Sequence, residues 1–112
     1  MKNEMVETAV AALIDRKADA VKSLFVGESA GITEYFVLAT GDSRPQLNAL
    51  TDAVEEAMNM AGYIMKGREG RAEGGWILLD YGEIVVQIFS REMREFYNLD
   101  HTWKDVPSES FC

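Results

Sequence analysis

The sequence predicts a single α/β domain: a mixed five-stranded sheet with its helices packed mainly on one face. Two segments, residues 3–17 and 44–61, have apolar residues at the spacing of amphipathic helices. Apolar runs of strand length, rich in β-branched and aromatic residues, lie between and after these segments. A chain of 112 residues is long enough to bury one hydrophobic core.

The first half of the chain is predicted to contain one helix and two strands. Four apolar residues recur at the spacing of one helical face: Val6, Val10, Leu13 and Ile14. They predict a helix over residues 3–17. Residues 19–26 alternate loosely between polar and apolar, which predicts a strand that ends in a turn at 27–31. Residues 35–40 are nearly all apolar, as is typical of a central strand covered on both faces.

The second helix has a strong start signal. Ser43 can accept a hydrogen bond from the free N–H groups of the first turn, and Gln46 three residues later completes a capping box. Pro45 fits the first turn, where no N–H donor is needed. An apolar stripe continues to Ala61, and Gly62 is a typical C-terminal cap. A helix placed here can join two parallel strands, so the sheet is expected to be mixed.

Residues 63–89 are predicted to form a short strand, a loop and a β-hairpin. The strand is expected at 63–65, and the glycine-rich, charged segment 66–75 is expected to be a mobile loop. Residues 76–81 and 84–89 are apolar runs joined by a Tyr-Gly turn, which is the pattern of a hairpin. Because neither run alternates cleanly between apolar and polar, both strands should be covered on both faces.

The C-terminal part is predicted to be a helical turn followed by a tail. Residues 90–95 are charged and precede the sequence Phe-Tyr-Asn-Leu at 96–99. We expect the domain to span residues 1–105. Residues 106–112 are expected to form a flexible tail, because the sequence becomes polar there.

The net charge of −8 restricts the partners of this chain. A chain this acidic is repelled by a phosphate backbone unless its Lys and Arg residues gather on one face. The one basic concentration, Lys66, Arg68 and Arg71, is diluted by Glu69 and Glu73. We therefore expect little or no direct contact with nucleic acid, and an attraction to a basic protein partner.

Few residue types suited to catalysis or metal binding are present. His101 is the only histidine and Cys112 the only cysteine, so the sequence has no His cluster and no Cys-based zinc site. We expect no cofactor. No apolar stretch approaches the ~20 residues of a membrane-spanning helix. The N-terminus carries acids and lacks the pattern of a secretory signal, so we expect a cytoplasmic protein without membrane contact.

Two local patterns have both a catalytic and a structural interpretation. Residues 41–43 precede a helix, where anions can bind, but they lack the Lys-Ser/Thr pair of a phosphate-binding loop. An ordinary capped turn is favoured. Asp80 and Glu83 form a carboxylate pair, but they flank a turn, where such residues are usually solvated. For Trp76 and Tyr97, a core position and an interface position are about equally favoured, because each lies at the edge of an apolar run.

Four stretches of the sequence resemble one known family. They are residues 34–41, 53–62, 69–86 and 94–99, the last followed by Trp103. The most specific are the blocks Trp-Ile-Leu-Leu-Asp-Tyr-Gly-Glu and Arg-Glu-Phe-Tyr-Asn-Leu. In this order they make the chain similar to the ribosomal silencing factor family, which is also called RsfS or Iojap.

The resemblance implies a nucleotidyltransferase-like fold without the activity. Enzymes of that fold hold two metals with a Gly-Ser and a following Asp-x-Asp/Glu pair, whereas Asp52 here has no second acid two residues later. The resemblance also implies binding to large-subunit ribosomal protein fourteen. That binding blocks joining of the ribosomal subunits and lowers translation under nutrient limitation. Pro45 departs from the family pattern, which usually has arginine there.

On these grounds we expect a protein-binding surface made by the open sheet face and the C-terminal turn. Its residues are Glu69, Gly70, Trp76, Leu78, Asp80, Tyr97 and Leu99. Period-two alternation places Trp76, Leu78 and Asp80 on one side of their strand. Trp76 and Tyr97 are the expected anchors, and Asp80 and Glu69 the expected charge partners of Lys or Arg. Two alternatives stay open: a nucleotidyltransferase-like enzyme, and a homodimeric interaction module unrelated to the ribosome.

Overall fold

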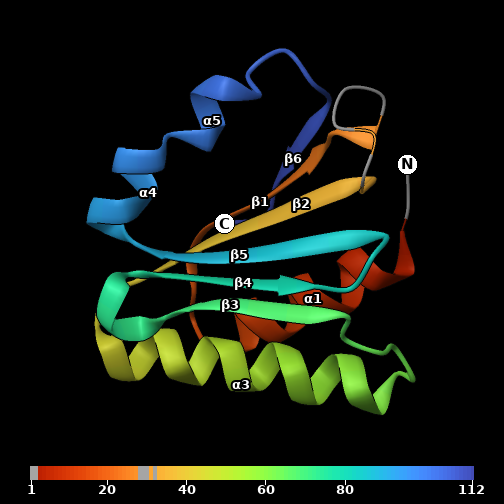
Figure 1. Ribbon diagram of the computed structural model, residues 1–112, viewed down its shortest axis with the longest axis horizontal. Coiled ribbons are helices and arrows are strands. Elements are labelled where there is room, and N and C mark those ends of the chain that lie inside the picture. Colours follow the sequence, from red (N-terminus) through yellow and green to blue (C-terminus); the bar gives the residue numbers. More distant parts are fainter. Residues whose placement is uncertain (1–2, 28–30, 32) are drawn as a thin grey trace.

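The centre of the molecule is a mixed sheet with the strand order β3-β4-β5-β2-β1-β6 (Figure 1). This computed structural model describes residues 3–27, 31 and 33–112. The strands are β1 (Asp19–Phe25), β2 (Tyr35–Gly41), β3 (Gly67–Arg71), β4 (Trp76–Asp80), β5 (Ile84–Ser90) and β6 (Ser108–Ser110). The helices are α1 (Glu4–Asp15), α3 (Arg44–Met60), α4 (Arg91–Tyr97) and α5 (Leu99–Thr102), with a 3₁₀ turn at Ala72–Gly74. The turn expected at 27–31 includes residues 28–30, which lie outside the described residues.

The sheet is mixed, as the sequence predicts. β2 and β5 run parallel, with Tyr35 opposite Ile84, while the other described neighbours run antiparallel. The predicted hairpin is confirmed, since β4 and β5 pair antiparallel around the turn at Gly82, where φ is +85°. The expected number of five strands is wrong, because the sheet has six. Both differences from the expected strands lie at the sheet edges.

The first difference concerns the segment after α3. Residues 63–65 form no strand, and Ile64 is 82% exposed. The strand is instead β3, within the segment expected to be a loop, and it pairs with β4 from Gly67–Asp80 to Arg71–Trp76. Its side chains are all exposed. Charged residues on an edge strand discourage pairing with other chains, so the polarity that suggested a loop is compatible with an edge strand.

The second difference concerns residues 106–112, where we expected a flexible tail. β6 pairs with β1 from Lys22–Ser110 to Leu24–Ser108. The Phe111 N–H donates to the Val21 carbonyl at 2.8 Å, and the Phe111 side chain packs against the core. The segment therefore belongs to the fold and completes the second edge of the sheet.

The two long helices cover one face of the sheet, as predicted. Their buried residues are Val6, Ala9, Val10 and Leu13 of α1, and Leu47, Leu50, Thr51, Val54 and Met58 of α3. The apolar residues of this set pack with Ile77, Leu79, Val86 and Ile88 of the hairpin. The opposite face, called the outer face below, carries a smaller cluster of Leu24, Val26, Leu38 and Phe89. Figure 1 shows α4 and α5 on that side, above one end of the sheet.

The start of α3 follows its sequence signal with one change. The Gln46 N–H donates to Ser43 Oγ at 3.2 Å, so the predicted cap forms. Gln46 Oε1 accepts from the Asp42 N–H at 2.6 Å, one residue before the donor of a standard capping box. Gln46 Nε2 also donates to the Lys17 carbonyl, which fixes the start of α3 against the end of α1.

The two faces of β4 predict different mutational costs. Ile77→Ala should lower the free energy of unfolding by about 2–5 kcal/mol, because Ile77 is fully buried and its truncation leaves a cavity. The matched control Leu78→Ala should cost roughly 1 kcal/mol or less, because that side chain is partly exposed on the outer face. Urea denaturation measures both. Equal losses would contradict the assignment of the two faces.

Candidate functional site

The outer face brings together most of the residues that the sequence analysis selected. Trp76, Leu78 and Asp80 alternate with the buried Ile77 and Leu79, so they share the outer side of β4. The register places Glu69 of β3 and Gln87 of β5 on either side of Leu78. Cross-strand partners point to the same side of a sheet. A strip of neighbouring side chains therefore crosses β3, β4 and β5 on the outer face.

An aromatic cluster of Trp76, Phe89, Phe96 and Tyr97 lies at one end of this strip. The Tyr97 ring centroid is 5.9 Å from those of Trp76 and Phe89, and 5.4 Å from that of Phe96. Trp76 Nε1–H donates to Gln87 Oε1 at 3.1 Å, which fixes the indole on the sheet. Tyr97 is 45% and Phe96 74% exposed. The cluster is thus anchored at Phe89 and open to solvent at α4.

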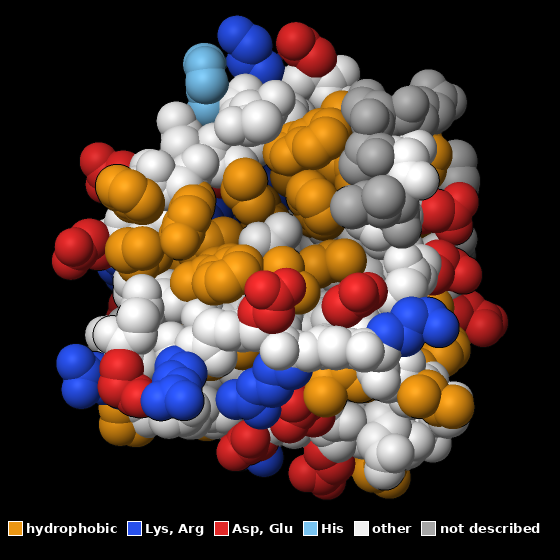
Figure 2. Space-filling view, viewed as in Figure 1, with side chains coloured by type: hydrophobic (Ala, Val, Ile, Leu, Met, Phe, Trp, Pro, Cys, Tyr) orange, Lys and Arg blue, Asp and Glu red, His pale blue; other side chains and the backbone are white. Residues whose placement is uncertain are grey.

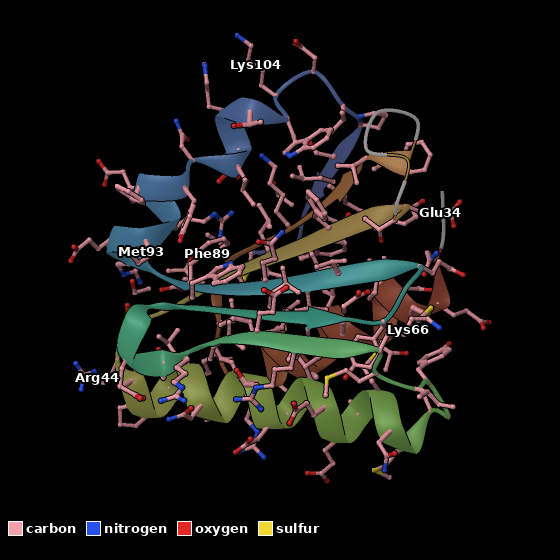
Figure 3. The ribbon with its side chains drawn as sticks, in the orientation of Figure 1. Glu34, Arg44, Lys66, Phe89, Met93 and Lys104 are labelled. Carbon is pink, nitrogen blue, oxygen red and sulfur yellow. The ribbon has the colours of Figure 1, made fainter. Side chains whose placement is uncertain are left out.

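The surface view shows this arrangement directly. Apolar side chains gather in a band over α4, α5 and the adjacent sheet, and acidic side chains lie along its borders (Figure 2). Phe89 and Met93 lie side by side where β5 continues into α4 (Figure 3). Met93 packs partly buried against the smaller cluster. Partly exposed aromatic residues around a buried anchor are typical of protein-binding surfaces.

The carboxylates predicted for this face, Asp80 and Glu69, and the nearby Glu83 have different surroundings. Asp80 Oδ1 accepts from the Gly82 N–H at 2.8 Å, so one oxygen stabilises the hairpin turn. Glu69 is exposed on the edge strand β3. Glu83 Oε2 accepts from Asn3 Nδ2 at 2.5 Å. Asp80 and Glu83 therefore both have structural contacts, as expected of residues that flank a turn.

Gly70 and Leu99 have structural positions beside the strip. Gly70 has φ +83°, and a Cβ there would lie 2.1 Å from the Trp76 carbonyl oxygen. Only glycine allows β3 to approach β4 at this point. Leu99 begins α5 and is partly buried against the smaller cluster. Gly70 therefore allows the close contact with the Trp76 backbone, and Leu99 packs α5 against the sheet.

Three residues that shape this face were not predicted from the sequence: Gln87, Arg94 and Phe96. Gln87 belongs to the apolar run 84–89, and Phe96 belongs to the segment Phe-Tyr-Asn-Leu at 96–99, but neither was predicted to be a site residue. Neighbouring side chains of a helix point about 100° apart, so Phe96 and Tyr97 were not expected to pack equally on the sheet. No local pattern indicated the contacts of Arg94, because its partners in β1 and β2 lie far away in the sequence.

Arg94 is the most connected polar side chain at this end of the described structure. Its Nε and Nη2 donate to the two carboxylate oxygens of Asp100 at 2.8 and 3.1 Å. Its Nη1 donates to the Ala20 carbonyl and to Thr40 Oγ1, both at 3.0 Å. Lys22 Nζ lies 3.4 Å from Asp100 Oδ1. The hydrogen bond from Arg94 lowers the pKa of Asp100, partial burial opposes this, and the charges of Arg94 and Lys22 reinforce it.

Neither a metal centre nor a membrane segment is found among the described residues. No group of three or more His, Cys, Asp or Glu side chains in this part of the chain is placed to hold a metal ion. Gly41 ends β2, and residues 42–43 form the capped turn before α3, with Ser43 as the cap. Within the same described ranges, every helix is too short or too polar to cross a membrane.

The fold defined here is found in solved structures. A crystal structure of a protein from Chromobacterium violaceum superposes with a TM-score of 0.86 at 31% identity, covering 90% of this chain and 84% of that chain. Both molecules therefore share one α/β fold with a mixed sheet.

The sequence relatives define the family. The family model "Ribosomal silencing factor during starvation" matches residues 1–111. The ribosomal silencing factor RsfS of Halalkalibacterium halodurans is 31% identical over 94% of this chain and 90% of its own length. The chloroplastic protein Iojap of Arabidopsis thaliana is 36% identical over 77% of this chain, but over only 36% of its own length. The chain belongs to the ribosomal silencing factor family, as its sequence blocks indicate.

The Arg94–Asp100 pair predicts a pH dependence of stability. A carboxyl whose pKa is lower in the folded than in the unfolded state stabilises the fold above its unfolded pKa of about 3.9. That stabilisation is lost as the pH falls through the folded pKa. Asp100→Asn should therefore destabilise the protein at neutral pH, and the difference from wild type should shrink in acid. Urea denaturation of both proteins across this range measures it; a difference independent of pH would contradict the pairing.

Proposed function

We propose that this protein binds the large ribosomal subunit through ribosomal protein fourteen and prevents the small subunit from joining. Translation is thereby repressed in the cytoplasm under nutrient limitation. Membership of the family supports the proposal, since the relatives are named as ribosomal silencing factors. The resemblance of the sequence blocks to that family implies that the binding partner is large-subunit ribosomal protein fourteen.

One observation carries the choice of surface. Trp76, Leu78 and Tyr97 are apolar side chains that remain partly exposed and adjacent on the outer face of a protein of net charge −8. Burying such side chains against a partner gains free energy that the isolated chain does not obtain. Trp and Tyr are also the residue types most often found at interface hot spots. We assign them as the anchors of the complex.

Charge complements these anchors. Glu69 and Asp80 lie beside the apolar side chains of this face; Glu69 is exposed and Asp80 partly exposed. Carboxylates at the rim of an interface attract Lys and Arg of a basic protein and speed association. The overall acidic charge supports the same partner class and disfavours extensive contact with ribosomal RNA.

Silencing by this route needs no chemical step. A protein that occupies the surface required by the small subunit competes with it, and repression follows from concentration and affinity. We infer from the family resemblance that the fold is nucleotidyltransferase-like. The metal-binding acid pair is missing, because Asp52 lies exposed on α3 with no second acid two residues later. The chain is then a binding protein that is not an enzyme.

A homodimer that uses the same face is the second candidate. Phe96 is 74% exposed beside Tyr97, and an exposed aromatic pair favours self-association. A dimer formed in this way would hide the anchors until the ribosome displaced the second copy. Sedimentation of the wild type and of Phe96→Ser at micromolar concentrations tests this candidate. A wild type that sediments as a monomer would exclude it in that range.

The anchor assignment predicts the effect of truncating Trp76 and Tyr97. Trp76→Ala and Tyr97→Ala should each weaken binding to isolated large subunits by about 2 kcal/mol or more, roughly thirtyfold, because hot-spot residues cost this much. Met60→Ala is the control, since Met60 is an exposed apolar residue on α3, behind the covered face. It should bind like wild type in co-sedimentation.

A subunit-joining assay completes this test. The wild type should reduce the formation of joined ribosomes, and the two anchor variants should not at equal concentration. Circular dichroism separates unfolding from loss of binding. If Trp76→Ala unfolds, the indole is core. If Tyr97→Ala stays folded and binds normally, the outer face is not the ribosomal contact.

A further inference from the structure

α4, which ends at Tyr97, and α5 are held on the sheet by little buried apolar surface. Neither α4 nor α5 contributes a buried residue within the described structure. A helix of seven residues is also not stable by itself in water. Met93, Leu99 and the adjacent Trp103 pack, partly buried, against the smaller cluster, and the partly exposed Tyr97 ring contacts Phe89. Because this packing is only partly buried, we expect polar contacts to help set the angle of α4 and α5 on the sheet.

Arg94 supplies those contacts. Its guanidinium joins α4 to three other elements through Ala20 of β1, Thr40 of β2 and Asp100 of α5. Its side chain is only 13% exposed. Ala20 has φ +49° and lies where the β1–β2 register shifts, so its carbonyl is outside the regular ladder and accepts from Arg94.

The junction between the helices fixes the same geometry. Asn98 has φ +50° and ends α4, and its N–H donates to the Arg94 carbonyl at 3.0 Å. The chain then turns directly into α5, which returns Asp100 to the Arg94 side chain. A planar fork with several donors can hold a carboxylate, a carbonyl and a hydroxyl together, whereas the single ammonium of lysine cannot reach all three.

We propose that Arg94 is a positioning residue for the partner-binding face. It holds α4 and α5 at the angle at which Tyr97 packs on Trp76 and Phe89. Its Nε, Nη1 and Nη2 groups all donate within the chain, so its effect on the partner passes through Tyr97. This inference rests on the proposed function for the identity of the partner, but the positioning itself is a property of the free protein.

The test compares Arg94→Met with Arg91→Met. Both changes remove one arginine from α4, but Arg91 is exposed and pairs only with Asp19 and Asp42 at the surface. Exposed ion pairs contribute little, so Arg91→Met should change affinity for large subunits by about twofold or less. Arg94→Met should weaken binding about tenfold or more, because the anchor is no longer held in place.

Two readouts separate positioning from general stability. NMR contacts between the rings of Tyr97 and Trp76 in the free protein should be lost in Arg94→Met and kept in Arg91→Met, while both remain folded. In a double-mutant cycle, Arg94→Met should cost little more once Tyr97 is alanine, because the two act as one unit. Additive losses, or ring contacts that persist in Arg94→Met, would overturn the proposal.

Two further outcomes are decided by the same design. If Arg94→Met does not fold, Arg94→Lys replaces it, and loss of the ring contacts with reduced affinity is expected from that variant too. Arg94→Lys with wild-type contacts and affinity would overturn the proposal. If the wild type binds no large subunits, the proposed function fails, and the ring contacts in the free protein alone decide the positioning role.

Discussion

The structure depends on covering a sheet that is apolar on both faces. β5 pairs with β2 and β4 in the sheet interior, and its side chains are buried on both sides from Ile84 to Phe89. α1 and α3 cover one face completely enough to bury Val86 and Ile88. Among the described residues, two short helices cover the outer face; they bury Phe89 but leave Trp76 and Tyr97 partly exposed. The outer face is where apolar side chains and incomplete cover coincide.

Polar contacts and partly buried apolar packing together hold the cover on that face. The described surface has several exposed ion pairs, which contribute little to stability. Arg94 differs because its side chain is mostly buried and the side-chain hydrogen bonds described for it all reach other elements of the fold. Polar contacts can thus help to keep a binding surface in one conformation where the apolar cluster beneath it is small. The arrangement supports the proposed role of this face in binding a protein partner.

The sequence was most informative where structure is set locally. The cap at Ser43, the hairpin around Gly82 and the alternation of Trp76 with Ile77 follow from neighbouring residues, and each was predicted correctly. β3 and β6 were missed because edge strands are defined by pairing with β4 and β1, while their own side chains are polar and exposed. The contacts of Arg94 were also missed, since they join residues 54 and 74 positions apart. The pattern of apolar and polar side chains indicates which residues are buried, but it does not indicate with which distant strand a segment pairs.

Amide hydrogen exchange of this protein, free and bound to isolated large ribosomal subunits, tests the central claim most directly. We infer that the ribosomal contact is the part of the outer face formed by β3, β4 and α4. Binding should slow exchange of amides in residues 67–80 and 91–99, and leave α1 and α3 unchanged. Protection confined to α1 and α3, with the outer face exchanging as in the free protein, would contradict it.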